Sequence, residues 1–85
     1  MAKEINYPEQ MVMNLSKLIE ETGANDKNYT IEQKALDIIT ALEHILAYTI
    51  YTTCTDANAI RDSAEQSCLN IKKQAVYIHQ QNLPE

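Results

Sequence analysis

Glycine, proline and the larger aromatic residues are scarce in this chain of 85 residues, which has one glycine, two prolines, no tryptophan and no phenylalanine. Phosphate-binding loops and dinucleotide-binding fingerprints need several glycines so that the backbone can approach the ligand, and neither motif can be assembled here. Sheet-rich folds need repeated tight turns, which so little glycine and proline cannot supply. These scarcities favour a helical fold.

Positive charge and long apolar runs are also in short supply. The chain has 7 Lys and Arg residues against 12 Asp and Glu residues, so its formal net charge is −5. Such a surface repels phosphates, and we expect no direct binding to nucleic acid and no docking on an anionic membrane. No run approaches the roughly 18 apolar residues of a membrane span. The first residues lack the apolar core of a secretory signal, and we therefore expect a cytoplasmic protein.

Residues that carry catalysis or bind metals are few and lie far apart in the sequence. Two cysteines, Cys54 and Cys68, and two histidines, His44 and His79, form no Cys-x-x-Cys or other metal-ligand spacing. We interpret the cysteines as small, buried and reduced side chains. The sequence therefore predicts a protein that is not an enzyme, with no catalytic residue, no metal site and no cofactor.

Apolar residues recur at helical spacing in three segments, over about residues 8–22, 31–53 and 56–81. The pattern predicts an all-α fold, a three-helix up-down-up bundle that pairs with a second copy to form a larger helical bundle. We expect one helical domain over residues 1–85, with tails at residues 1–6 and 82–85.

Capping residues mark the predicted ends of these segments. Pro8 suits the first helical position, and Gly23 suits the left-handed position that follows a helix. Thr30 and Gln33 have the spacing of a capping box at the start of the second segment. Asp56, or Thr55 before it, is a candidate N-cap for the third segment.

The boundary between the second and third segments is the weakest in the chain. Residues 52–56 read Thr-Thr-Cys-Thr-Asp, and their side chains compete with the backbone for hydrogen bonds. Because this stretch has no glycine or proline, a single continuous helix of about fifty residues is the alternative to a break. Such a helix would have to dimerise in order to bury its faces.

Two groups of residues predict an interface. No charged residue lies between Glu43 and Asp56, and His44, Tyr48 and Tyr51 fall on one side of the second segment, away from its aliphatic stripe. On the third segment, the predicted core stripe consists of Ala57, Ile60, Ala64, Cys68, Ile71, Ala75 and Ile78. A row with seven-residue spacing lies to one side of this stripe, and a single neighbouring helix cannot cover both. This row consists of Leu69, Val76 and Leu83.

These groups favour a small acidic helical interaction module, an adaptor, chaperone-like or regulatory factor, that acts as a homodimer and binds another protein. One alternative is an acidic inhibitor that mimics nucleic-acid charge and blocks a nucleic-acid-binding enzyme. That alternative requires one face to gather the acidic residues Glu9, Glu20, Glu21, Asp26 and Glu43. A further alternative is a helical carrier or ligand-binding bundle, which requires an apolar cavity beside Ala64, Cys68 and Ala75.

Overall fold

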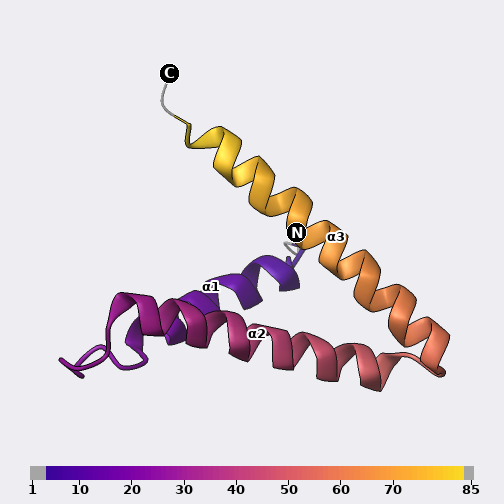
Figure 1. The fold of residues 1–85 in the computed structure, drawn as a ribbon, viewed down its shortest axis with the longest axis horizontal. Coiled ribbons are helices and arrows are strands. Elements are labelled where there is room, and N and C mark those ends of the chain that lie inside the picture. The colour runs from indigo at the N-terminus through magenta and orange to yellow at the C-terminus, as the bar shows by residue number, and fades with distance from the viewer. Residues whose placement is uncertain (1–3, 84–85) are drawn as a thin grey trace. The chain divides into compact units, whose positions relative to one another are not determined.

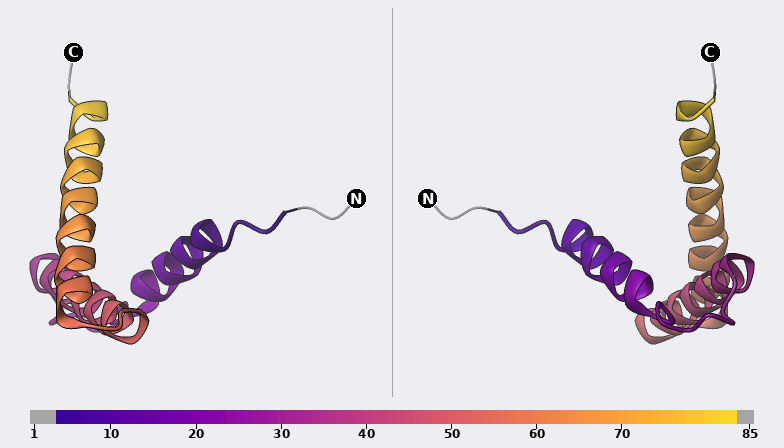
Figure 2. Two further views of the ribbon diagram at one scale, coloured as in Figure 1. Left: turned by 90° about the vertical axis from the view of Figure 1, so that its right-hand side faces the viewer. Right: turned by 90° about the vertical axis from the view of Figure 1, so that its left-hand side faces the viewer.

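The computed structural model describes residues 4–83, which form three α-helices (Figures 1 and 2). They are α1 (Tyr7–Glu21), α2 (Ile31–Thr53) and α3 (Ala57–Gln81), and no strand occurs within these residues. The predicted all-α class and the three helices are confirmed. The boundaries of α2 are as predicted, α1 is shifted by one residue toward the N-terminus, and α3 begins one residue later.

The ends of α1 follow from its capping residues. The Asn6 side chain accepts a hydrogen bond from the Glu9 N–H at 3.0 Å, so the helix begins at Tyr7 and Pro8 is its second residue. At the other end, the Thr22 N–H and hydroxyl both donate to the Leu18 carbonyl, at 2.9 and 2.7 Å. The helix therefore ends at Glu21, one residue before the predicted end.

Gly23 is required where the chain leaves α1. Its φ angle is +69°, in the left-handed region that side-chain-bearing residues disfavour. A Cβ atom at this position would also run into the aromatic ring of Tyr29. The predicted role of Gly23 as a left-handed cap is confirmed, and its contact with Tyr29 gives a second reason for glycine here.

The start of α2 forms only half of the predicted capping box. The Thr30 hydroxyl accepts a hydrogen bond from the Gln33 N–H at 3.1 Å. The Gln33 side-chain amide donates to the Asp37 carboxylate at 3.0 Å. Because the Gln33 side chain binds Asp37, one turn further along α2, it does not reach back to the N-terminus of the helix as a capping box requires.

A break separates α2 from α3, so the continuous-helix alternative is wrong. The Thr53 hydroxyl donates to the carbonyls of Thr49 and Ile50, and the Cys54 N–H also donates to Ile50. These bonds satisfy the last carbonyls of α2. Asp56 then caps α3, since its carboxylate accepts from the Ala59 N–H at 2.9 Å. Of the two predicted caps, Asp56 is the one used.

Contacts between Cα atoms divide the chain into two compact units, Met1–Thr40 and Ala41–Glu85, with the division inside α2. In the first unit, the Lys34 ammonium donates to the Glu20 carbonyl at 3.3 Å and so joins the start of α2 to the end of α1. Ile19 and Ile38 are half-buried in this unit. The single domain over residues 1–85 stays a prediction.

Burial in the second unit is concentrated close to the turn between α2 and α3. Among residues 4–83, Ile50 is the only hydrophobic residue that is buried, with 8% of its surface exposed. The half-buried residues of this unit are Cys54, Ala59, Ile60, Ser63, Ala64 and Ser67. Further along α3, Ile71 and Ile78 of the predicted core stripe are exposed. The stripe is therefore covered only near the turn.

None of the helices formed by residues 4–83 combines the length and the apolar character that crossing a membrane requires.

Candidate interaction surfaces

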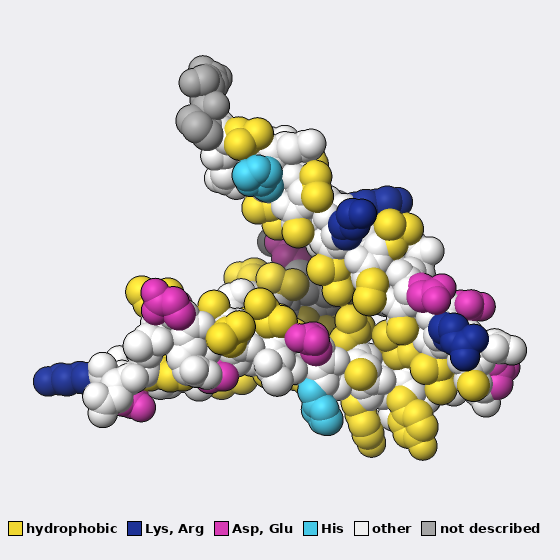
Figure 3. Space-filling model, in the orientation of Figure 1, with side chains coloured by type: hydrophobic (Ala, Val, Ile, Leu, Met, Phe, Trp, Pro, Cys, Tyr) yellow, Lys and Arg dark blue, Asp and Glu magenta, His cyan; other side chains and the backbone are white. Residues whose placement is uncertain are grey.

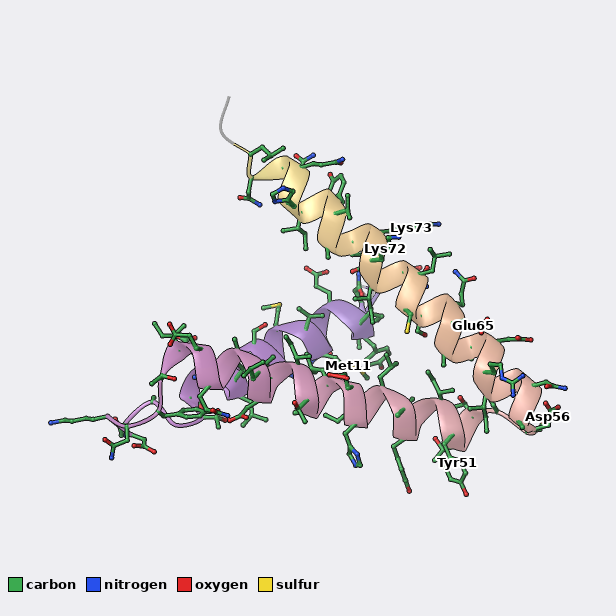
Figure 4. The ribbon with its side chains drawn as sticks, in the orientation of Figure 1. Met11, Tyr51, Asp56, Glu65, Lys72 and Lys73 are labelled. Atoms are coloured by element: carbon green, nitrogen blue, oxygen red, sulfur yellow. The ribbon has the colours of Figure 1, made fainter. Side chains whose placement is uncertain are left out.

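His44, Tyr48 and Tyr51, together called the tyrosine surface below, lie on α2. Their spacing of four and three residues places them on one helix face, and all three are exposed. Tyr48 and Tyr51 are 63% and 65% exposed, with ring centroids 6.3 Å apart and an interplanar angle of 45°. Tyr51 projects from α2 on the side away from α3 (Figure 4). The two rings thus form a paired aromatic surface that the second unit leaves open to solvent.

The polar groups around the tyrosine surface are satisfied within α2 itself. The hydroxyl of Thr49 donates to the Ile45 carbonyl at 2.7 Å. The hydroxyls of Thr52 and Thr53 donate to the Thr49 carbonyl at 2.9 and 3.0 Å. These threonines therefore need no partner from outside the helix. Together with the lack of charged residues between Glu43 and Asp56, this leaves the ring of His44 and the hydroxyls of Tyr48 and Tyr51 as the polar groups that a partner would have to satisfy.

Leu69, Val76 and Leu83, together called the α3 seam, are exposed by 43%, 48% and 53%. Leu69 and Val76 lie within α3, and Leu83 follows its last turn. The Leu83 N–H donates to the Gln80 carbonyl at 3.5 Å, but Leu83 lies past the Asn82 cap and outside the helix. The seven-residue spacing keeps Leu69 and Val76 on nearly the same side of α3.

The two groups of predicted interface residues belong to the same unit but to different helices. The structure does not bring them together, because Tyr51 points away from α3. Hydrophobic side chains lie at the surface of both helices of this unit (Figure 3). The second unit therefore has two separate apolar surfaces, one on each helix.

A hydrogen-bonded group that the sequence analysis did not predict lies at the start of α2. The Tyr29 hydroxyl donates to one oxygen of the Asp37 carboxylate at 2.6 Å, and the Gln33 amide donates to the other at 3.0 Å. The hydrogen bond to Asp37 raises the pKa of Tyr29, with smaller contributions from desolvation and from the negative charge of Asp37. Gln33 and Asp37 are four residues apart on a helix, and this spacing could have predicted their hydrogen bond. No pattern in the sequence indicated that Tyr29, which lies in the loop before α2, also bonds to Asp37.

Tyr29 gives a prediction for the pH dependence of stability. Because its folded-state pKa is raised above the unfolded value of 10.0, its contribution is fully present below that pH. It is lost as the pH rises through the folded pKa. Tyr29→Phe should remove a component of the phenolate absorbance that titrates above pH 10.0, and it should flatten the alkaline loss of stability. Tyr48→Phe is the control and should leave that component in place, whereas an unchanged titration in Tyr29→Phe would contradict the assignment.

Within residues 4–83, no three His, Cys, Asp or Glu side chains gather into a group that could hold a metal ion. Cys54 and Cys68 are free thiols, and the prediction that both are buried is wrong. Cys54 is half-buried, and Cys68 is exposed because it lies beyond the covered part of α3. A surface pocket is lined by Lys73, Gln74, Tyr77 and Ile78, all on α3. The lining residues do not include Ala64, Cys68 or Ala75, beside which the carrier interpretation expects a cavity.

The acidic residues that the inhibitor interpretation requires are divided between the two units. Glu43 belongs to the second unit, and the other four residues belong to the first. Within the first unit, Glu9 lies in the first turn of α1 and Glu20 in its last turn. Neither unit by itself presents the complete acidic face.

No family model matches the chain, and comparisons with curated proteins and with solved structures give no match. The functional argument therefore depends on the surfaces of this chain.

Proposed function

We propose that the chain is a small acidic interaction module that is not an enzyme and that acts as a homodimer. In this proposal the three helices adopt up-down-up order and pair with a second copy to form a larger helical bundle. The observation that carries the proposal is the contrast in burial. Ile50 is buried, whereas the tyrosine surface, the α3 seam and most other large hydrophobic side chains are exposed.

The size of the exposed apolar area supports association. A buried aromatic side chain hides about 150–250 Å². Tyr48 and Tyr51, each nearly two-thirds exposed, therefore present roughly 250 Å² together. At about 25 cal/mol per Å², covering this area is worth at most about 6 kcal/mol. A single small core supplies only about 3–5 kcal/mol of net stability. Covering such surfaces therefore adds a sizeable favourable contribution, which the entropy cost of association reduces.

The chemistry of the two surfaces supports a protein as the partner. Tyrosine is enriched where proteins bind one another, because it combines a large apolar ring with a hydroxyl that tolerates water. A net charge of −5 and the absence of Lys and Arg between His44 and Thr55 disfavour nucleic acid and anionic lipid. The free thiols of Cys54 and Cys68 are compatible with the reducing cytoplasm that the proposal assumes.

Unfolding at several protein concentrations tests the proposal. If a dimer is the folded species, mass action stabilises it as the concentration rises, by about 1.4 kcal/mol for each tenfold increase. The urea midpoint should then move upward over a hundredfold range of concentration. The measurement is made with reductant present so that Cys68 cannot link two chains. An identical midpoint at every concentration would contradict the proposed homodimer.

A further inference from the structure

The exposed face of α3 carries opposite charges on the two sides of Leu69, the first residue of the α3 seam. Glu65 precedes Leu69 by one turn, and Lys72 and Lys73 follow it by one turn. At about 100° per residue, these four residues and Val76 lie within about 100° of arc. Glu65, Lys72 and Lys73 all project from α3 on the side away from α2 (Figure 4). Asp62 falls within the same arc, and Arg61 lies just outside it. From Asp62 to Lys73 the face is therefore acidic before Leu69 and basic after it.

These charges cannot satisfy one another within their own helix. Glu65 is seven residues from Lys72 and eight from Lys73, or about 10–12 Å along the axis. Side chains on a helix pair over three or four residues. Arg61 stands at that spacing from Glu65, whereas no acidic residue stands at that spacing from Lys72 or Lys73. The helix dipole does not account for them either, because its effect is limited to the first and last turns. All three residues lie further inside α3 (Ala57–Gln81).

We propose that this face of α3 packs antiparallel against the same face of a second copy, with the two Leu69 side chains meeting at the centre. A two-fold axis at Leu69 places Glu65 of each chain opposite Lys72 and Lys73 of the other. Each opposite-charge pair thus occurs twice. The inference rests on the proposed homodimer and adds the surface, direction and register of the contact.

Charge disfavours two other ways of pairing this face. Parallel helices would place Glu65 against Glu65 and the lysines against the lysines. An antiparallel register with Leu69 opposite Val76 would also bring the two lysine pairs together. Like charges facing each other suppress wrong pairings. Of these three arrangements, the register centred on Leu69 is the one that places opposite charges opposite each other.

The first test measures dimer dissociation constants for two charge-reversal variants. Glu65→Lys places like charges at both ends of the contact and should raise the dissociation constant about tenfold, if each of its pairs is worth about 0.5–1 kcal/mol. Overall charge would have the opposite effect, because Glu65→Lys makes the chain less acidic and so reduces the general repulsion between two copies. Lys72→Glu/Lys73→Glu should weaken the dimer as strongly.

Matched controls make the same change in net charge on the first unit. Glu20→Lys matches Glu65→Lys, and Lys17→Glu/Lys27→Glu matches the double lysine variant. All three control positions are exposed. The controls should stay within about threefold of the unmodified chain, which corresponds to surface effects of about 0.5 kcal/mol. Circular dichroism of each variant establishes that the helices are retained.

The decisive test mixes the two weakened variants. In a mixed dimer, the lysine introduced by Glu65→Lys faces the two glutamates introduced into the other chain. The unchanged Glu65 of that other chain faces Lys72 and Lys73 of the first, so both charge contacts are restored. Native mass spectrometry should show the mixed dimer in large excess over either homodimer.

Two results would overturn this inference and leave the homodimer itself standing. One is that the charge variants behave like their controls, and the other is that the mixture yields no mixed dimer. An unmodified chain that is monomeric throughout would instead overturn the proposed function.

Discussion

Replacing Ile50 by alanine should lower the free energy of unfolding by about 2–5 kcal/mol. Ile50 lies near the turn that joins α2 to α3, and at 8% exposure it is the buried hydrophobic residue of the described chain. The substitution removes the favourable transfer free energy of the side chain and leaves a cavity that its neighbours fill only in part. Because a chain of this size has about 3–5 kcal/mol of core stabilisation, we expect the loss to appear as a large drop in helical circular dichroism at ambient temperature.

Ile31→Ala is the matched control for that experiment. Ile31 begins α2 and is 86% exposed, so the same chemical change should alter the free energy of unfolding by no more than about 0.5 kcal/mol. Urea unfolding of the two variants side by side gives the comparison. Equal effects at the two positions would show that Ile50 does not hold α2 and α3 together.

Replacing Leu69 by glutamate should raise the dimer dissociation constant by about tenfold to a hundredfold, equivalent to roughly 1.4–2.8 kcal/mol. Leu69 is 43% exposed in the single chain, and in the proposed contact the second copy covers that remaining surface. The variant removes this apolar burial from both chains and places two carboxylates at the two-fold axis. Glutamate is a good helix former, so α3 itself should be retained.

Leu36→Glu makes the same substitution on α2 in the first unit, where Leu36 is also exposed. Both variants carry one additional negative charge, so a general increase in repulsion affects them equally. We expect Leu36→Glu to associate like the unmodified chain in sedimentation experiments. A dissociation constant raised to the same extent in both variants would argue against a specific contact at Leu69.

The three helices were predictable because their signals are local. Apolar spacing located the segments, and Gly23 and Asp56 marked boundaries where one residue type solves one backbone problem. Asn6 was not predicted as a cap, although its side chain sets the start of α1. The break before Asp56 was the weakest prediction, because threonine hydroxyls rather than glycine or proline end α2 there.

The sequence did not predict how much of each apolar stripe is covered. Helical spacing identifies the residues on a face, but the length over which two helices stay in contact depends on packing between distant residues. Ile60 and Ile71 belong to one predicted stripe, yet Ile60 is half-buried and Ile71 is exposed. The exposure of Cys68 was not predicted for the same reason. The bond between Tyr29 and Asp37 was not predicted because it depends on the path of the loop after Gly23.

The candidate interface was predictable as two groups of residues but not as one arrangement. The uncharged end of α2 identified the tyrosine surface, and the seven-residue spacing identified the α3 seam. Glu65 and Lys72 are also seven residues apart, but the sequence interpretation used this spacing to find apolar residues and did not consider charged ones. Glu65 and Lys72 can contact a second copy only because they project from α3 on the side away from α2.

Sedimentation equilibrium of the full chain at micromolar concentrations, in reducing buffer, measures association most directly. The account predicts a species of twice the 9.7 kDa chain mass, with dissociation promoted by Leu69→Glu and by high salt, since salt screens the paired charges. A folded chain that sediments at the mass of one copy over the whole concentration range would contradict it.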